Sequence, residues 1–155
     1  QASGFMIAWQ VGLTLANLFF GFLADRKGHK LILEICWLLN TLALVLALIA
    51  SQPGWFFLVF FLAGAVSGGT FISGIAIVYE FTAADDRPTY IGLANTLPGI
   101  MVSLAPLIGG WLVGVLNYRW MFLLSALSAA VSWLLLRFAV REPRLSSPEL
   151  NSKEL

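Results

Sequence analysis

The stretch Gly21-Phe-Leu-Ala-Asp-Arg-Lys-Gly-His-Lys30 is a short charged segment between two long apolar runs. Asp25, Arg26, Lys27 and Lys30 fall within six residues, whereas the flanking runs are almost uncharged. A charge at the centre of a bilayer costs about 2.5–3.5 kcal/mol even on the lenient insertion scale. We therefore expect this charged segment, residues 21–30, to lie at a membrane surface and to connect two spans.

The composition is that of an integral membrane protein. Of the 155 residues, 59% are hydrophobic and only 11% are charged, whereas a soluble domain has about 25% charged residues. About 20 residues of helix cross a hydrocarbon core, and none of the apolar runs alternates with the period of two that marks a barrel strand. We expect an all-α polytopic bundle over residues 1–144 and a disordered cytoplasmic tail over residues 145–155. The five expected transmembrane helices are residues 4–23, 31–50, 55–79, 90–116 and 120–140.

The cations are sorted between the two ends of these spans. Eight Lys and Arg residues fall on the side of the charged segment, and one, Arg119, falls on the other side. Because cytoplasmic loops carry an excess of Lys and Arg, the side of the charged segment is predicted to be cytoplasmic, with the C-terminus inside. The eight are Arg26, Lys27, Lys30, Arg87, Arg137, Arg141, Arg144 and Lys153.

The charged segment resembles the loop signature of the major facilitator superfamily, G-x-L-a-D-r-x-G-r-K/R. That signature lies between the second and third helices and recurs, in weaker form, between the eighth and ninth. His29 stands where Arg is commoner, and we interpret it as a substitute cation. The matching residues are Gly21, Leu23, Asp25, Arg26, Gly28 and Lys30.

Small and hydroxylated residues dominate the third run. Gly64 and Gly68 form a G-x-x-x-G pair, which lets helix backbones approach closely in lipid. The hydroxyl residues Ser67, Thr70 and Ser73 have two open interpretations: they belong to the same packing face, or they line a polar pathway for a solute.

Prolines and glycines recur in the fourth run, where Pro98 and Pro106 are expected to kink the helix. The sequence from Pro106 onward resembles the fifth-helix motif g-x-x-x-G-P-x-x-G-G of the same superfamily, which is echoed in the eleventh helix. Met101 and Ala105 stand where the motif has its two leading glycines, so the resemblance is not extended to drug–proton antiport. The glycines expected to permit close helix packing are Gly109, Gly110 and Gly114.

Charged residues near the cytoplasmic ends are expected to be paired. Glu34 is the only acid inside an apolar run, and its position four residues after Lys30 favours an ion pair with Lys30 or Arg26. Arg137, near the end of the last run, is expected to extend its guanidinium to the membrane surface.

The fourth helix is expected to begin just after Asp86. Aspartate is a favourable N-cap residue, and Pro88 fits the first turn, where its missing N–H costs nothing.

Catalytic and metal-binding functions find no support in the residues. With one His, one Cys and no embedded acidic pair, no catalytic constellation or metal site can be assembled. We expect no enzyme activity, no cofactor, no metal and no nucleic-acid partner.

The resemblance implies two six-helix halves around a central substrate cavity, with access alternating between the two sides. The five runs then resemble helices eight to twelve, because the third run lacks an early Arg and the last ends in Val140-Arg-Glu-Pro-Arg144. Ser67, Thr70 and Ser73 would line the cavity, and Asp25 would brace the cytoplasmic gate against a helix N-terminus of the other half.

On this reading the chain is the C-terminal part of a secondary transporter in the cell membrane. Its expected partners are the lipid bilayer, the missing N-terminal half and a small-molecule solute. The alternative is a complete five-span structural or accessory protein that packs against a partner subunit. Additional spans encoded upstream of Gln1 would favour the transporter.

Overall fold

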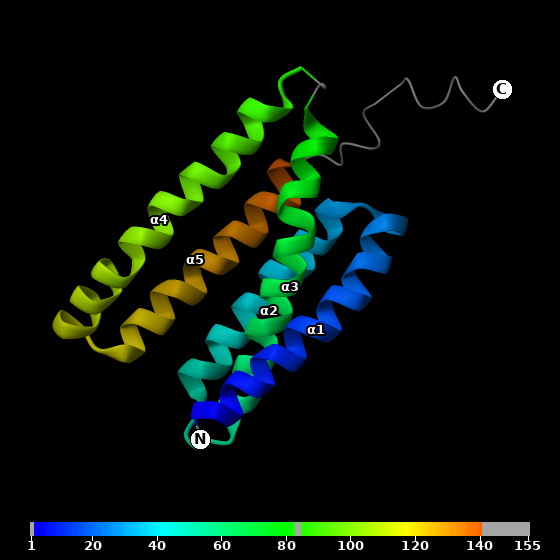
Figure 1. Ribbon diagram of the computed structural model, residues 1–155. Coiled ribbons are helices and arrows are strands. Elements are labelled where there is room, and N and C mark those ends of the chain that lie inside the picture. The colour runs from blue at the N-terminus through cyan, green and yellow to red at the C-terminus, as the bar shows by residue number, and fades with distance from the viewer. Residues whose placement is uncertain (1, 83–84, 141–155) are drawn as a thin grey trace.

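The computed structural model describes residues 2–82 and 85–140, and these residues form a bundle of five helices without strands (Figure 1). All five helices are long and apolar enough to cross a membrane. The expected all-α, five-span fold is therefore confirmed, while the tail expected over residues 145–155 lies outside the described residues. The helices are α1 (Ala2–Lys27), α2 (His29–Ile49), α3 (Trp55–Phe81), α4 (Arg87–Val115) and α5 (Tyr118–Ala139).

The charged segment is helical, not a loop. Helix α1 continues to Lys27 and α2 begins at His29, so Gly28 alone separates them. Gly28 has φ 90°, in a region that favours glycine, and its N–H donates to the Ala24 carbonyl at 2.9 Å. This explains why the signature has glycine at this position: the chain must reverse within one residue.

The connectors alternate between the two ends of the bundle. The turn at Gly28, the end of α3, the start of α4 and the end of α5 lie at one end, and the other connections lie at the opposite end (Figure 1). An alternating order of this kind is what five successive crossings of one bilayer require.

Backbone-to-backbone contact joins α1 to α3. A Cβ atom at Gly12 would overlap the carbonyl oxygen of Phe61, and one at Gly64 would overlap that of Trp9. A Cβ at Gly68 would lie only 2.8 Å from the Leu13 carbonyl oxygen. The G-x-x-x-G pair of α3 therefore packs directly on α1, and Gly12 supplies the matching small residue.

Around this contact lies a small core shared by α1, α2 and α3. The buried thiol of Cys36 belongs to it, where it packs as a small apolar side chain. Many large apolar side chains elsewhere on the helices are exposed, as residues facing lipid tails are. The buried residues of the core are Ala16, Phe20, Ala24, Ile32, Cys36 and Ala65.

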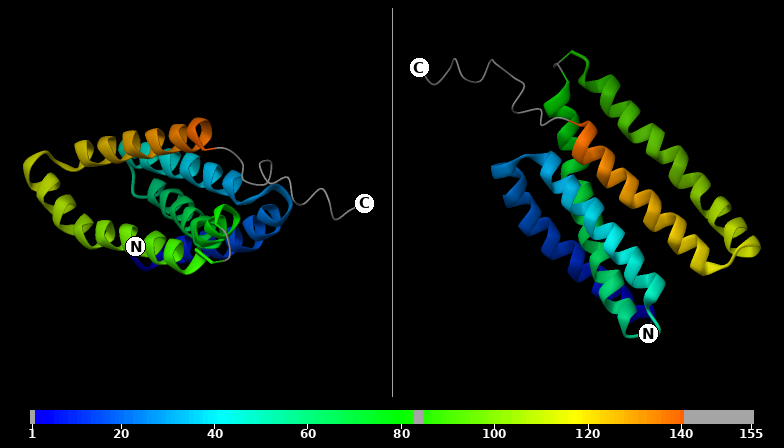
Figure 2. Two further views of the ribbon diagram at one scale, coloured as in Figure 1. Left: turned by 90° about the horizontal axis from the view of Figure 1, so that it is seen from above. Right: turned by 180° about the vertical axis from the view of Figure 1, so that it is seen from behind.

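Helix α4 is the least packed helix. It contacts α3 and α5 only weakly and stands apart from α1 and α2 in the right-hand view of Figure 2, whereas α5 lies along α2. Among the described residues none in α4 is buried, and a Cβ at Gly109, Gly110 or Gly114 would meet no atom within 4 Å. The close packing predicted for these glycines is therefore not made within the described chain.

The two prolines of α4 do not interrupt it. Pro98 and Pro106 both lie inside one continuous helix, so the predicted kinks do not divide α4. Asp86 occupies the N-cap position and a proline follows in the first turn, as predicted. The Asp86 side chain makes no capping hydrogen bond, and its backbone is αR (φ −93°) instead of the extended conformation usual at an N-cap.

The contact between α1 and α3 gives a stability prediction. Gly64→Ala should lower the free energy of unfolding by about 1–3 kcal/mol, because the added methyl group overlaps backbone atoms of α1. Gly74→Ala, on the same helix but with no atom within 4 Å of its Cβ, is the control and should be neutral or slightly stabilising. Unfolding equilibria in detergent micelles measure both, and equal effects would contradict the contact.

Candidate functional site

The residues of the charged segment are held by α1, α2 and the core. Leu23 packs against the buried core cluster. The guanidinium of Arg26 lies 4.3 Å from the centre of the Phe22 ring, in a cation–π contact. Asp25 is exposed at the end of α1, beside the turn at Gly28. The signature thus places an exposed aspartate three residues before the reversal of the chain at Gly28.

Glu34 joins the charged segment to the last helix. Its Oε1 lies 3.1 Å from Lys30 Nζ, and its Oε2 accepts a hydrogen bond of 2.9 Å from Arg137. The Glu34 and Lys30 side chains are only 7% and 11% exposed, whereas that of Arg137 is 54% exposed. The predicted pair with Lys30 is confirmed. The bond from Arg137, 103 residues away, was not predicted from the sequence.

His29 also has a partner that the sequence did not reveal. Its Nδ1 lies 3.3 Å from the Oγ of Ser73, which is fully buried in α3. The hydrogen bond links the start of α2 to the third helix. The interpretation of His29 as a substitute cation stays a prediction, and the structure adds a contact that ties the turn to α3.

The hydroxyl residues of α3 are used differently from one another. Ser67 donates to the Ala63 carbonyl at 2.9 Å, and Thr70 donates to the Val66 carbonyl at 2.8 Å. Both are half-buried, so both retain some open surface. Ser73 has none, and its hydroxyl faces His29. A role of these three residues in a solute cavity remains a prediction.

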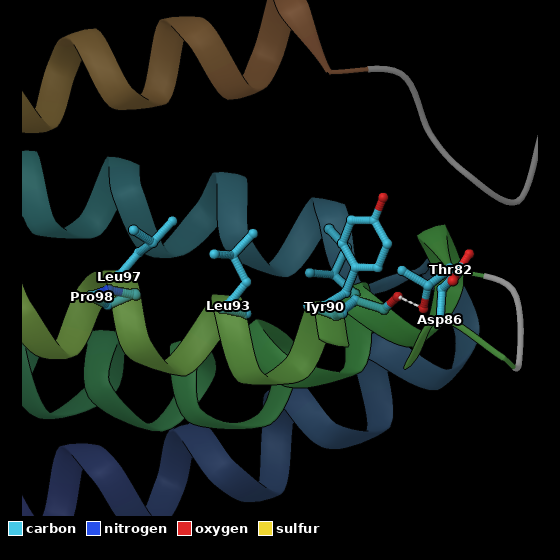
Figure 3. Close-up of a pocket in the computed structure, with 9 residues that line it drawn as sticks. Thr82, Asp86, Tyr90, Leu93, Leu97 and Pro98 are labelled. Carbon is cyan, nitrogen blue, oxygen red and sulfur yellow. Dashed lines mark hydrogen bonds between the residues drawn. The ribbon is translucent and has the colours of Figure 1, made fainter. Parts of the chain in front are cut away.

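A pocket of about 480 Å³ lies between α3 and α4, beside the connection that joins them (Figure 3). Its size is in the range of small-molecule sites, roughly 300–1,000 Å³. The sequence suggested no site here, since the lining comes from two helices and from the ends of the connection between them. The lining residues are Ile77, Val78, Thr82, Asp86, Tyr90, Leu93, Ala94, Leu97 and Pro98.

The His, Cys, Asp and Glu residues of the described part of the chain do not form a cluster that could bind a metal ion. No group of three or more His, Cys, Asp or Glu residues is placed to hold a metal ion there.

The ion pairs of Glu34 give a second stability prediction. Glu34→Gln should lower the free energy of unfolding by roughly 3 kcal/mol, because it leaves the nearly buried Lys30 ammonium without a counterion. Arg137→Gln should lower the free energy of unfolding by less than about 1 kcal/mol, because Glu34 retains its ion pair with Lys30 and the Arg137 side chain is half exposed. Chemical unfolding in micelles compares the two variants, and a larger effect of Arg137→Gln would refute this ranking.

Comparison with known proteins identifies the family. The family model described as Major Facilitator Superfamily matches residues 1–155. The multidrug resistance protein MdtL of Salmonella paratyphi B is 30% identical over 135 residues, which are 86% of this chain and 34% of the relative. MdtL proteins of Salmonella typhimurium and Salmonella dublin match with the same identity and coverage. The chain thus spans about a third of the length of these relatives. It is a multi-pass membrane protein and belongs to the Major Facilitator Superfamily.

Proposed function

We propose that this chain is the C-terminal part of a secondary transporter that moves a small solute by alternating access, and that it is not an enzyme. The observation that carries the proposal is the match of the family model to all 155 residues. The position of the signature supports it, because the exposed Asp25 lies three residues before the chain reversal at Gly28, between two spans. Facing a helix N-terminus of the other half, this carboxylate would gain roughly 0.3–1 kcal/mol.

The open face of α4 supports the presence of further helices. Its glycines meet no neighbour in the described chain, and none of its residues is buried there. In lipid, glycine faces serve close helix packing. We propose that the remaining part of the transporter, which corresponds to the N-terminal half of its relatives, packs against α4 and against the exposed face of α1.

The orientation and the solute are also part of the proposal. The excess of Lys and Arg favours a cytoplasmic position for the charged segment, in the cell membrane. The relatives are named multidrug resistance proteins, and we extend to this chain the transport of small drug-like compounds.

Transport is tested by reconstituting the protein, as its gene encodes it, into liposomes with a panel of lipophilic cations, neutral drugs and sugars. We expect flux of at least one solute class. The 155-residue chain alone should give none, because the cavity then lacks one of its two halves. Flux from the chain alone would contradict the proposed fragment and would favour a complete five-span protein.

The gate is tested in the same assay with Asp25→Ala. We expect turnover to fall about two- to fivefold, since an interaction of roughly 0.3–1 kcal/mol is lost from one state of the cycle. Lys27→Ala is the matched control, because Lys27 is an exposed charge in the same turn at a variable position of the signature. Equal turnover of the Asp25→Ala variant and the unmodified protein would refute the gate role.

A further inference from the structure

A cavity of about 460 Å³ lies between the end of α2 and the start of α5. Both of these helix termini lie at the end of the bundle opposite to the charged segment (Figure 1). The lining residues are Leu48, Ile49, Asn117, Arg119, Trp120 and Leu123. This cavity therefore shares no residue with the charged segment or with the pocket between α3 and α4.

Arg119 brings a positive charge to this cavity, and the chain has no acid at this end to pair with it. Residues 1–24, 35–79 and 88–141 include every connection at this end of the bundle, and they contain no Asp or Glu. Within the described residues the Arg119 guanidinium makes no ion pair and no cation–π contact. Its counterion therefore has to come from outside these residues.

The other polar groups that the lining leaves unused are hydrogen-bond donors. Asn117 Oδ1 accepts from the backbone N–H of Arg119 at 3.0 Å and from that of Trp120 at 3.3 Å, so the amide N–H groups of Asn117 are left over. The Trp120 indole and the Arg119 guanidinium carry donors and no acceptor. Because the first-turn amides of α5 already have a partner, the attraction for an anion comes from side chains and not from the helix terminus.

Apolar side chains continue the cavity toward the hydrocarbon. Leu123 is one turn further into α5 than Arg119, and Leu48 lies one residue before the end of α2. Trp120 is half exposed beside them, at the interfacial position where tryptophan is common in membrane proteins. The donors thus lie nearer the membrane surface and Leu123 lies deeper, which is the polarity of an amphiphile held upright in one leaflet.

Charge complementarity selects among the amphiphiles of a bilayer. A phosphate group accepts hydrogen bonds from guanidinium, amide and indole N–H groups, and arginine binds phosphate in a bidentate manner. A zwitterionic headgroup also carries an ammonium group, for which the lining offers no carboxylate. Inorganic phosphate would make the same polar contacts but would leave the apolar walls without a partner. The lining therefore favours a phospholipid with a net negative charge.

We propose that this cavity binds an anionic phospholipid of the leaflet on the side opposite to the charged segment. Arg119 and Asn117 would bind the phosphate, and an acyl chain would lie along Leu123. The contacts proposed for the rest of the transporter, at α4 and α1, leave the cavity open to lipid. The inference goes beyond the proposed function and does not depend on it, because it requires only that α2 and α5 span the bilayer.

Lipid preference is measured on the protein, as its gene encodes it, in detergent micelles. The protein is titrated with phosphatidylglycerol and with phosphatidylethanolamine of the same acyl chains, and native mass spectrometry counts the bound lipids. We expect phosphatidylglycerol to bind at least about fivefold more tightly. Equal affinity for the two lipids would overturn the proposal.

The location is tested with Arg119→Gln, which should weaken the tightest binding of phosphatidylglycerol about tenfold, because the phosphate loses its charge-assisted hydrogen bonds. Lys27→Gln is the matched control, since it removes an equal charge from an exposed side chain at the opposite end of the bundle, and its affinity should be that of the unmodified protein. An equal loss in the two variants, or no loss in the Arg119→Gln variant, would refute the location.

The apolar part of the site is tested by filling it. Leu123→Trp should abolish this binding, whereas Leu124→Trp, at an exposed neighbouring position outside the lining, should leave it unchanged. Unchanged binding in the Leu123→Trp variant would contradict a lipid held between α2 and α5.

A free anion is distinguished from a lipid by competition. Inorganic phosphate in large excess should not displace phosphatidylglycerol, since it gains nothing from the apolar walls. Displacement by inorganic phosphate would indicate a site for a soluble anion and would overturn the assignment to a lipid.

Discussion

The structure depends on one constraint: hydrocarbon can solvate neither a charge nor an unpaired backbone group. Each apolar run therefore forms a continuous helix, and the charges collect at the helix ends. Near the end that adjoins the charged segment α2 carries Glu34, and there the carboxylate is bonded to Lys30 and Arg137. The charged segment obeys the same rule, because it reverses the chain at Gly28 while its backbone stays helical on both sides.

In lipid, apolar burial does not drive helices together, so packing follows small residues and polar contacts. The closest contact of the bundle, between α1 and α3, is made at Gly12 and Gly64. Polar contacts then attach the neighbouring helices, since Glu34 joins α2 to α5 and His29 joins α2 to α3. Within the described chain α4 makes no glycine contact and no side-chain hydrogen bond to another helix, although the Arg87 guanidinium lies over the Tyr79 ring of α3. The weak packing of α4 is why we propose that its glycine face belongs to the rest of the transporter.

The sequence was sufficient for features that depend on neighbouring residues. The five spans, the G-x-x-x-G contact and the pair of Glu34 with Lys30 all follow from local spacing and composition. Contacts between distant residues were not accessible: Arg137 is 103 residues from Glu34, and Ser73 is 44 residues from His29. The pocket was missed because its lining depends on how α3 and α4 are placed on either side of their connection, as with Ile77 and Asp86. The connection expected over residues 24–30 was wrong in its extent, because helices continue through charged residues once they leave the hydrocarbon.

Sidedness of the helix ends tests the account most directly, because five crossings place residues 27 and 118 on opposite faces of the bilayer. Lys27→Cys and Tyr118→Cys, each introduced with Cys36→Ala, are labelled in intact cells and in inverted vesicles with a membrane-impermeant maleimide. The account predicts labelling of residue 118 only from outside and of residue 27 only from inside. Labelling of both from the same side would contradict the five-span topology, and with it the gate and the transport proposal.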